Sequence, residues 1–174
     1  MEEKLSLFVK QAEAVGASVH QAGSKEKAKE LVEKLINETD AEGTGVLWVK
    51  GAILDKFDSL KCTQPVHQTN FIDHAENAAF GVTEADSVLA ETGSVVSDAS
   101  DAGARIASML PNTHIVLVNS KNVFAQTPDV IEKIKVKPPA YFSFITGPSR
   151  TADIERVLTI GVHGPERLEI ILVD

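Results

Sequence analysis

The feature that most constrains the fold is a set of short apolar runs without alternating polar residues. Examples are "GVLWV" (45–49), "THIVLV" (113–118) and "RLEIILVD" (167–174). A strand that is apolar at consecutive positions has both of its faces covered, usually by helices. The runs therefore predict a layered α/β/α domain with a buried sheet.

Segments with helical patterns alternate with these strands. Residues 1–15 have apolar residues at the spacing of one helix face, and Ser24 is a favoured N-cap for a helix over 24–39. Further helices are expected at 53–60, 97–110, 128–134 and 151–158, and further strands at 16–22, 87–92, 94–98 and 140–145. The chain is predicted to form one domain over residues 1–174, with a helical N-terminal part at 1–40.

The net charge, the cysteine content and the lengths of the apolar runs exclude several classes of protein. A net charge of -8 argues against a general nucleic-acid partner, which needs a basic face. The single cysteine, Cys62, excludes a disulfide framework and an iron–sulfur cluster held by cysteines of this chain. No apolar run approaches the roughly 20 residues of a membrane helix, and the acidic start "MEEKLSLFVK" is unlike a signal peptide. We expect a cytoplasmic protein without membrane insertion.

The segment "FITGPSRTADIERV" (144–157) places an arginine, Arg150, where a helix is predicted to begin. The positive end of a helix dipole disfavours a cation, so a negative group is expected nearby. Gly147 permits a tight turn, and Pro148 stiffens it. The guanidinium of Arg150 can bind a carboxylate or a phosphate in bidentate fashion. The segment therefore predicts an anion site.

The two residues beside the arginine add to this prediction. Backbone N–H groups at Ser149 and Thr151 would be unsatisfied at a helix N-terminus, and their hydroxyls can also donate to an anion. A structural interpretation stays open, in which Ser149 or Thr151 caps the helix and Asp153 pairs with Arg150.

Two other segments carry candidate catalytic groups. Glu91 lies at a strand break, where a carboxylate can serve as a base, a nucleophile or a metal ligand. The neighbouring Thr92 and Gly93 can present a hydroxyl or an N–H to the bound anion, or they can simply form the bend. His163 precedes Gly164 in "GVHGP", and a histidine can transfer protons near neutral pH. The alternatives are a solvated glutamate at a turn and a histidine that closes a tight connection.

A third cluster lies in "VHQTNFIDHAE", which contains His67, Asp73, His74 and Glu76. Histidines and carboxylates can bind a metal ion. The seven-residue spacing of these histidines matches no metal signature, so we interpret the segment as surface, and we predict no metal site.

Three segments together resemble a known family. They are "GVTEADSVLAETGSVV" (81–96), "LPNTHIVLV" (110–118) and the stretch 146–174, which contains "GPSRTADIE" and "GVHGP". They resemble the LUD-domain family and, within it, the lactate utilization protein C group. The resemblance is strongest over 81–174 and weak in the N-terminal half.

The resemblance implies a fold similar to the sugar-phosphate isomerase and CoA-transferase superfamily. It also implies a part in oxidising L-lactate to pyruvate, together with iron–sulfur partner proteins that hold the clusters. In that function Arg150 and its neighbours would bind a small carboxylate or phosphate, with Glu91 and His163 as acid–base groups around it. The chain has no G-x-G-x-x-G fingerprint after a strand, and we assign it no cofactor of its own.

Two other functions remain open from the sequence. The chain could be a non-catalytic assembly or regulatory subunit that docks onto the iron–sulfur proteins. It could also be an enzyme acting on a sugar phosphate or CoA ester, with Glu91 as nucleophile by fold-level analogy.

Overall fold

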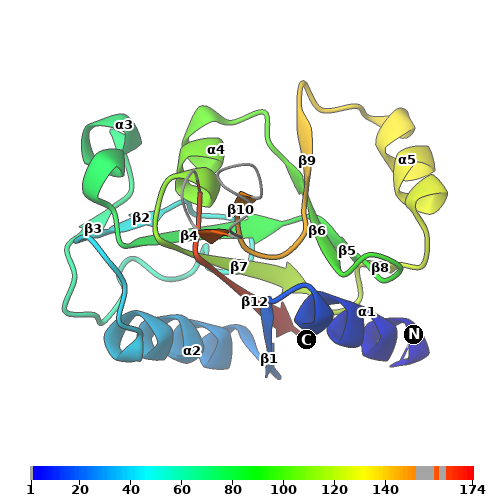
Figure 1. Ribbon diagram of the computed structural model, residues 1–174, viewed down its shortest axis with the longest axis horizontal. Helices are drawn as coiled ribbons and strands as arrows, with labels where there is room; N and C mark the ends of the chain where they lie inside the picture. Colours follow the sequence, from blue (N-terminus) through cyan, green and yellow to red (C-terminus); the bar gives the residue numbers. More distant parts are fainter. Residues whose placement is uncertain (1, 152–158, 161–163) are drawn as a thin grey trace.

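The computed structural model describes residues 2–151, 159–160 and 164–174 (Figure 1). The helices of this part of the chain are α1 (Glu2–Ala14), α2 (Lys25–Glu38), α3 (Phe71–His74), α4 (Ala102–Met109) and α5 (Thr127–Val136), with a 3-10 turn η1 (Ala75–Asn77). Within these ranges no helix has the length and apolarity needed to cross a bilayer.

The larger sheet is six-stranded, and every pair of neighbouring strands in it is parallel. Its spatial order is β1 (Ser18–Ala22), β12 (Arg167–Val173), β7 (Thr113–Asn119), β4 (Phe80–Ala85), β2 (Val46–Trp48) and β3 (Val66–His67). Strands β7 and β12 are buried along almost their whole length. This burial is why their sequences are continuous apolar runs.

A smaller sheet stands beside the larger one (Figure 1). Its spatial order is β8 (Val123–Phe124), β5 (Ser87–Leu89), β6 (Ser94–Asp98) and β9 (Phe142–Ile145). Strands β5 and β6 form a hairpin, and β9 runs antiparallel to β6 at the edge. A two-stranded ribbon is formed by β10 (Arg150–Thr151) and β11 (Thr159–Ile160).

Helices cover both faces of the larger sheet, which confirms the predicted layered α/β class. The apolar side of α2 packs on one face with alternate residues of β2, β4, β7 and β12. The other face is covered by α3 and α4 at one end, and by α1 with the β5–β6 hairpin at the other. Figure 1 shows α2 and α4 on opposite sides of the sheet.

Most predicted elements are present, with two corrections. The helix predicted at 53–60 is wrong, because this segment forms turns that pack against the sheet through Ile53 and Leu54. Strand β4, in the middle of the larger sheet, was not predicted at all. Its sequence "FGVTEA" mixes apolar residues with Gly81, Thr83 and Glu84, and so lacks the pattern of a buried strand.

The connections give the sheet a switch point between β2 and β4. From β2 the chain moves outward to β3, whereas from β4 it continues towards β7 and β12 on the other side. In open parallel sheets, ligands bind outside the carboxyl ends of strands at such a point. The polar groups that follow β2 and β4 are therefore the first place to look for a site.

Candidate functional site

A cavity of about 710 Å³ opens beside the carboxyl ends of β4 and β7. Its size lies in the range of roughly 300–1,000 Å³ that small-molecule sites occupy. The larger sheet, the end of β6, the start of β9, α5 and the first residue of α2 all contribute to its wall. Its charged, amide and aromatic side chains include Lys25, Glu84, Asn119, Lys133, Lys137 and Phe142.

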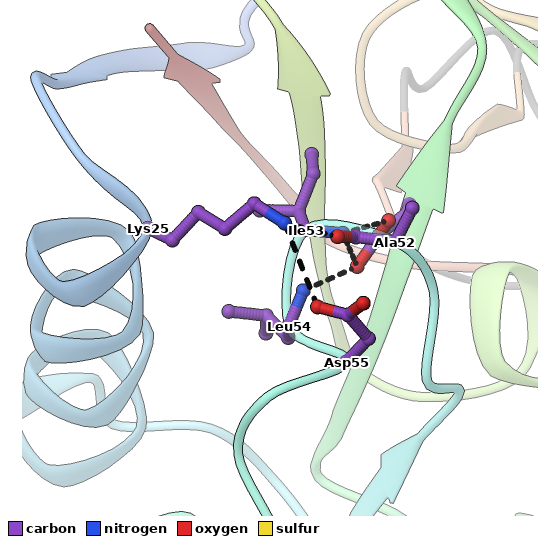
Figure 2. A network of polar contacts seen from close by, with 6 residues as sticks. Lys25, Ala52, Ile53, Leu54 and Asp55 are labelled. Atoms are coloured by element: carbon purple, nitrogen blue, oxygen red, sulfur yellow. Dashed lines mark hydrogen bonds and ion pairs between the residues drawn. The ribbon is translucent and has the colours of Figure 1, made fainter.

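The side chain of Glu84, in β4, bonds to the backbone that follows β2, and so links the two strands at the switch point. Its carboxylate accepts hydrogen bonds from the backbone N–H of Ile53, at 2.8 and 2.9 Å, and of Leu54, at 2.9 Å (Figure 2). Gly51 allows this approach, because a side-chain carbon there would overlap the carboxylate. Burial raises the pKa of Glu84, and the two N–H groups and the charge of Lys25 offset only part of that rise.

Lys25 supplies a positive charge next to this carboxylate. Its ammonium donates to the carbonyl oxygen of Ala52 and lies 3.5 Å from a carboxylate oxygen of Asp55 (Figure 2). The recorded ion pairs within the described ranges do not join Lys25 to Glu84. The Glu84 carboxylate is thus held by backbone groups, with a cation in its surroundings.

Two further lysines lie on the α5 side of the cavity. Lys133 lies in α5, and Lys137 is the residue just after its last residue; both line the cavity. The ammonium of Lys133 lies 5.1 Å from the centre of the Phe124 ring. The ion pairs found among the described residues include neither ammonium. The pKa of Asp98, which also lines the cavity, is lowered first by hydrogen bonds from Ser100 and last by the charge of Lys137, so Lys137 has an acidic neighbour there.

Several residues predicted as an anion site come together elsewhere, around the carboxyl end of α1. Gly93 and Gly147 both have positive φ, at 67° and 68°, and a side-chain carbon at either would overlap the backbone at this end of α1. The hydroxyl of Thr92 lies 2.6 Å from that of Ser94, which in turn lies 2.7 Å from that of Thr146. These contacts pack the β5–β6 turn and the end of β9 onto the helix.

Arg150 has a partner within the protein. Its Nη2 donates to the carbonyl oxygen of Val15 at 2.7 Å, just beyond the last residue of α1. This helix has no basic residue in its last turn, so Arg150 provides the cation that suits the negative end of the dipole. The predicted helix start at Arg150 is wrong, because Arg150 and Thr151 form β10. The rest of the predicted helix lies outside the described residues.

We expect Arg150→Ala to lower the free energy of unfolding by about 1 kcal/mol, because it removes a charge-assisted hydrogen bond at an exposed helix end. Arg150→Lys should recover part of this loss, since the charge remains. Urea unfolding followed by circular dichroism measures both variants. A stability of Arg150→Ala equal to that of the parent protein would contradict the capping role.

The other residues of this predicted site are placed as follows. The backbone N–H of Ser149 donates to the carbonyl oxygen of Pro165 at 2.8 Å. Pro148 packs near Gly16, and Gly164 packs near Ser149. The backbone of Thr151 pairs with β11. His163 lies outside the described residues, so its predicted role as an acid–base group stays a prediction.

Glu91 binds a different helix. Its carboxylate accepts hydrogen bonds from the Thr127 backbone N–H at 2.7 Å and from the Thr127 hydroxyl at 2.5 Å, at the first residue of α5. The Thr127 hydroxyl, and then its N–H, lower the pKa of Glu91. A negative group is favourable at a helix N-terminus. The geometry therefore gives Glu91 a capping role, while its predicted catalytic role stays a prediction.

The histidine-rich segment has its own arrangement. The rings of His67 and His74 stack with their centres 3.6 Å apart. Burial, and then the neighbouring His74, lower the pKa of His67. Within residues 2–151, 159–160 and 164–174, no group of three or more histidine, cysteine or acidic side chains lies close enough together to hold a metal ion.

Reasoning from the sequence missed the residues of the cavity. Glu84 was quoted only as part of a family segment, and Lys133 and Lys137 were assigned no role. One signal was present: Glu84 follows an apolar stretch and precedes Asp86 and Ser87. A strand over 80–85 would have placed this carboxylate at the carboxyl edge of the sheet, where sites form.

The fold and the cavity define an α/β protein with a ligand-sized site at the carboxyl edge of a parallel sheet. The chain belongs to the LUD domain family, whose family model matches residues 5–173. This result confirms the resemblance drawn from the sequence. In structure the chain is similar to a DUF162 family protein from Deinococcus radiodurans, with a TM-score of 0.70 and 20% identity over 99% of this chain and 98% of that one.

Curated relatives share the name lactate utilization protein C. The proteins from Bacillus velezensis, Geobacillus sp. and Bacillus subtilis are 38%, 39% and 40% identical to this chain over 109 residues. The matched stretch covers 59% of this chain and 45% of each relative. The chain therefore matches about half the length of these relatives.

Proposed function

We propose that this protein is a component of an L-lactate utilization system and that it binds a small organic anion in the cavity beside β4 and β7. Membership of the LUD domain family and the shared name of the relatives support the metabolic role. The single observation that carries the binding site is the cavity itself, at the switch point of the sheet and with lysines in its wall.

Three lysines line the cavity together with the acidic residues Glu84, Asp86 and Asp98, and the lysines are the groups that can bind a carboxylate ligand. Lys133 and Lys137 each bring an ammonium group to the cavity wall, where it can attract an anion and donate hydrogen bonds to its oxygens. Apolar residues of β6 and α5 form the wall between these lysines and the sheet. A small acid can therefore place its carboxylate on a polar group and its carbon atoms on an apolar surface.

The proposal leaves electron transfer to other proteins. The only cysteine is Cys62, a half-buried thiol whose pKa is raised by burial. One cysteine is too few to ligate an iron–sulfur cluster. Within this proposal the chain binds and orients the organic acid, and iron–sulfur partner proteins accept the electrons when the acid is oxidised.

A second candidate function is a non-catalytic assembly subunit. The observation that favours it is an exposed aromatic strip on and beside β9, the edge strand of the smaller sheet. Tyr141, Phe142 and Phe144 are 63%, 43% and 37% exposed. Exposed apolar side chains at a sheet edge are suited to contact with a partner protein.

The test is a thermal-shift titration with L-lactate and pyruvate at constant ionic strength. A ligand that binds the folded state raises the melting temperature. The double variant Lys133→Met/Lys137→Met should bind the acid about 10-fold more weakly, because two favourable charge contacts are lost. Lys135→Met is the matched control, because Lys135 lies on the same helix but pairs with Glu132.

The outcomes separate the alternatives. Equal melting shifts in the double variant and the control would remove the α5 lysines from the site. Loss of the shift in Arg150→Ala alone would favour the anion site predicted from the sequence over the cavity. No shift with either acid in the parent protein would favour the assembly subunit.

A further inference from the structure

Two successive backbone N–H groups after β2 form a small receptor for one carboxylate. The N–H groups of Ile53 and Leu54 both point to the Glu84 carboxylate, at 2.8 to 2.9 Å (Figure 2). Adjacent N–H groups in a turn that converge on one point make an anion-binding concavity. In this structure the anion is a side chain of the protein itself.

The surroundings of this receptor suit a ligand. Ile53 and Glu84 both line the cavity, so the receptor borders the space in which we place the ligand on its Ile53 side, with Leu54 buried behind it. Lys25 also lines the cavity, and its charge acts on the same carboxylate. Gly51 leaves room directly beside the receptor, where a side chain would collide with any group bound there.

Burial disfavours the ionised form of Glu84, although the hydrogen bonds from the receptor stabilise it. The carboxylate is half-buried, and the recorded ion pairs within the described ranges do not include it. The net rise in its pKa means that the ionised side chain is less stable here than in water. A group that only fixed the turn would not need to be charged, because a neutral amide oxygen accepts the same N–H bonds.

We propose that the Ile53 and Leu54 N–H groups are the receptor for the carboxylate of the organic acid, and that Glu84 occupies it until the ligand displaces it. This inference rests on the proposed function, which places a small carboxylic acid in the same cavity. The incoming carboxylate makes the same hydrogen bonds as Glu84. The exchange therefore conserves their number, and it releases the glutamate into the cavity.

Displacement has a consequence for affinity. Glu84 is tethered beside the receptor, so it competes as an internal ligand at a high effective concentration. A free carboxylate must overcome this competition, and a neutral analogue of the acid does not reproduce the charge-assisted bonds. Removing the side-chain carboxylate of Glu84 is therefore expected to strengthen the binding of external carboxylates.

The experiment is a titration with sodium acetate, followed by the ¹H–¹⁵N resonances of Ile53 and Leu54. Sodium chloride at the same ionic strength is the salt control. In Glu84→Ala, acetate should shift both amide resonances in a saturable way, with a dissociation constant at least about 10-fold lower than in the parent protein. Glu84→Gln should lie between the two, because its amide oxygen is a weaker acceptor than a carboxylate. Glu132→Ala, a change on the exposed face of α5, should behave as the parent does.

Each outcome decides the proposal. If the two amides are ordered in Glu84→Ala but acetate moves neither of them, the receptor does not exist. If Glu84→Ala disorders the turn, the titration is made with Glu84→Gln instead. An acetate affinity of Glu84→Gln equal to that of the parent protein then overturns the proposal.

The proposed function has a separate readout. If the parent protein binds L-lactate and the amide resonances of Ile53 and Leu54 do not shift, the receptor proposal is wrong and the proposed function stands. If acetate shifts these two amide resonances in Glu84→Ala but the parent protein does not bind L-lactate, the receptor proposal is supported and the proposed function is wrong.

Discussion

Gly81→Ala is expected to lower the free energy of unfolding by roughly 3 kcal/mol, at the upper end of the usual cost of overpacking. Gly81 lies in β4, and a side-chain carbon there would overlap the carbonyl oxygen of Ala107 in α4. The obstacle is backbone, which cannot rotate away as a side chain can. Either α4 must move off the sheet, or the central strand must shift.

Gly23→Ala is the control for this variant. Gly23 lies between β1 and α2, and a side-chain carbon there meets nothing within 4 Å. We expect a change of less than about 0.5 kcal/mol, as for most surface substitutions. Urea unfolding of both variants gives the comparison. Similar stabilities for the two would show that α4 packs less closely on β4 than described here.

The second large effect is expected for Phe8→Ala, at about 3–5 kcal/mol of unfolding free energy. Phe8 has an exposed fraction of 0% and joins α1 to apolar residues of the β5–β6 hairpin, β7 and β12. Deleting its ring leaves a void where three elements meet, and rigid strands collapse into such a void only in part. Calorimetry or urea unfolding measures the loss.

Leu7→Ala is the matched control on the same helix. Leu7 is 41% exposed and points away from this cluster, so we expect less than about 1 kcal/mol. If Phe8→Ala were no more costly than Leu7→Ala, the helix would not be part of the core.

Most of the fold was predictable from local pattern. The run "THIVLV" (113–118) became the fully buried part of β7, because an unbroken apolar strand needs cover on both faces. Ser24 caps α2 as its chemistry suggests, accepting a hydrogen bond from the Lys27 N–H at 3.2 Å. In these cases the residue and its immediate neighbours determine the structure.

The site was not predictable in the same way, because it depends on contacts between distant segments. The segment 53–60 has apolar residues at helix-like spacing, yet its N–H groups at Ile53 and Leu54 bond to Glu84, about 30 positions away. A bond between segments so far apart leaves no periodic pattern in the sequence. Glu84 was overlooked for the same reason.

Arg150 has a different environment from the one predicted, because it lies in β10 and not at a helix start. The sequence indicated that a cation in this segment needs a negative partner. That partner proved to be the Val15 carbonyl oxygen at the end of α1, 135 positions away. The predicted reason for this partner, a helix that begins at Arg150, is wrong, and the contact with α1 is visible only in the tertiary structure.

The position of β12 between β1 and β7 has a consequence for biosynthesis. The hydrogen bond between His20 of β1 and Glu169 of β12 joins residues 149 positions apart. At a translation rate of about 5–20 residues per second, β1 leaves the ribosome on the order of 10 s before its partner strand. During that time β1 and one side of β7 are open strand edges, which are prone to pair with other chains. A nascent chain without β12 therefore leaves β1 apart from the rest of the sheet, and chaperones that shield strand edges should matter most in that interval.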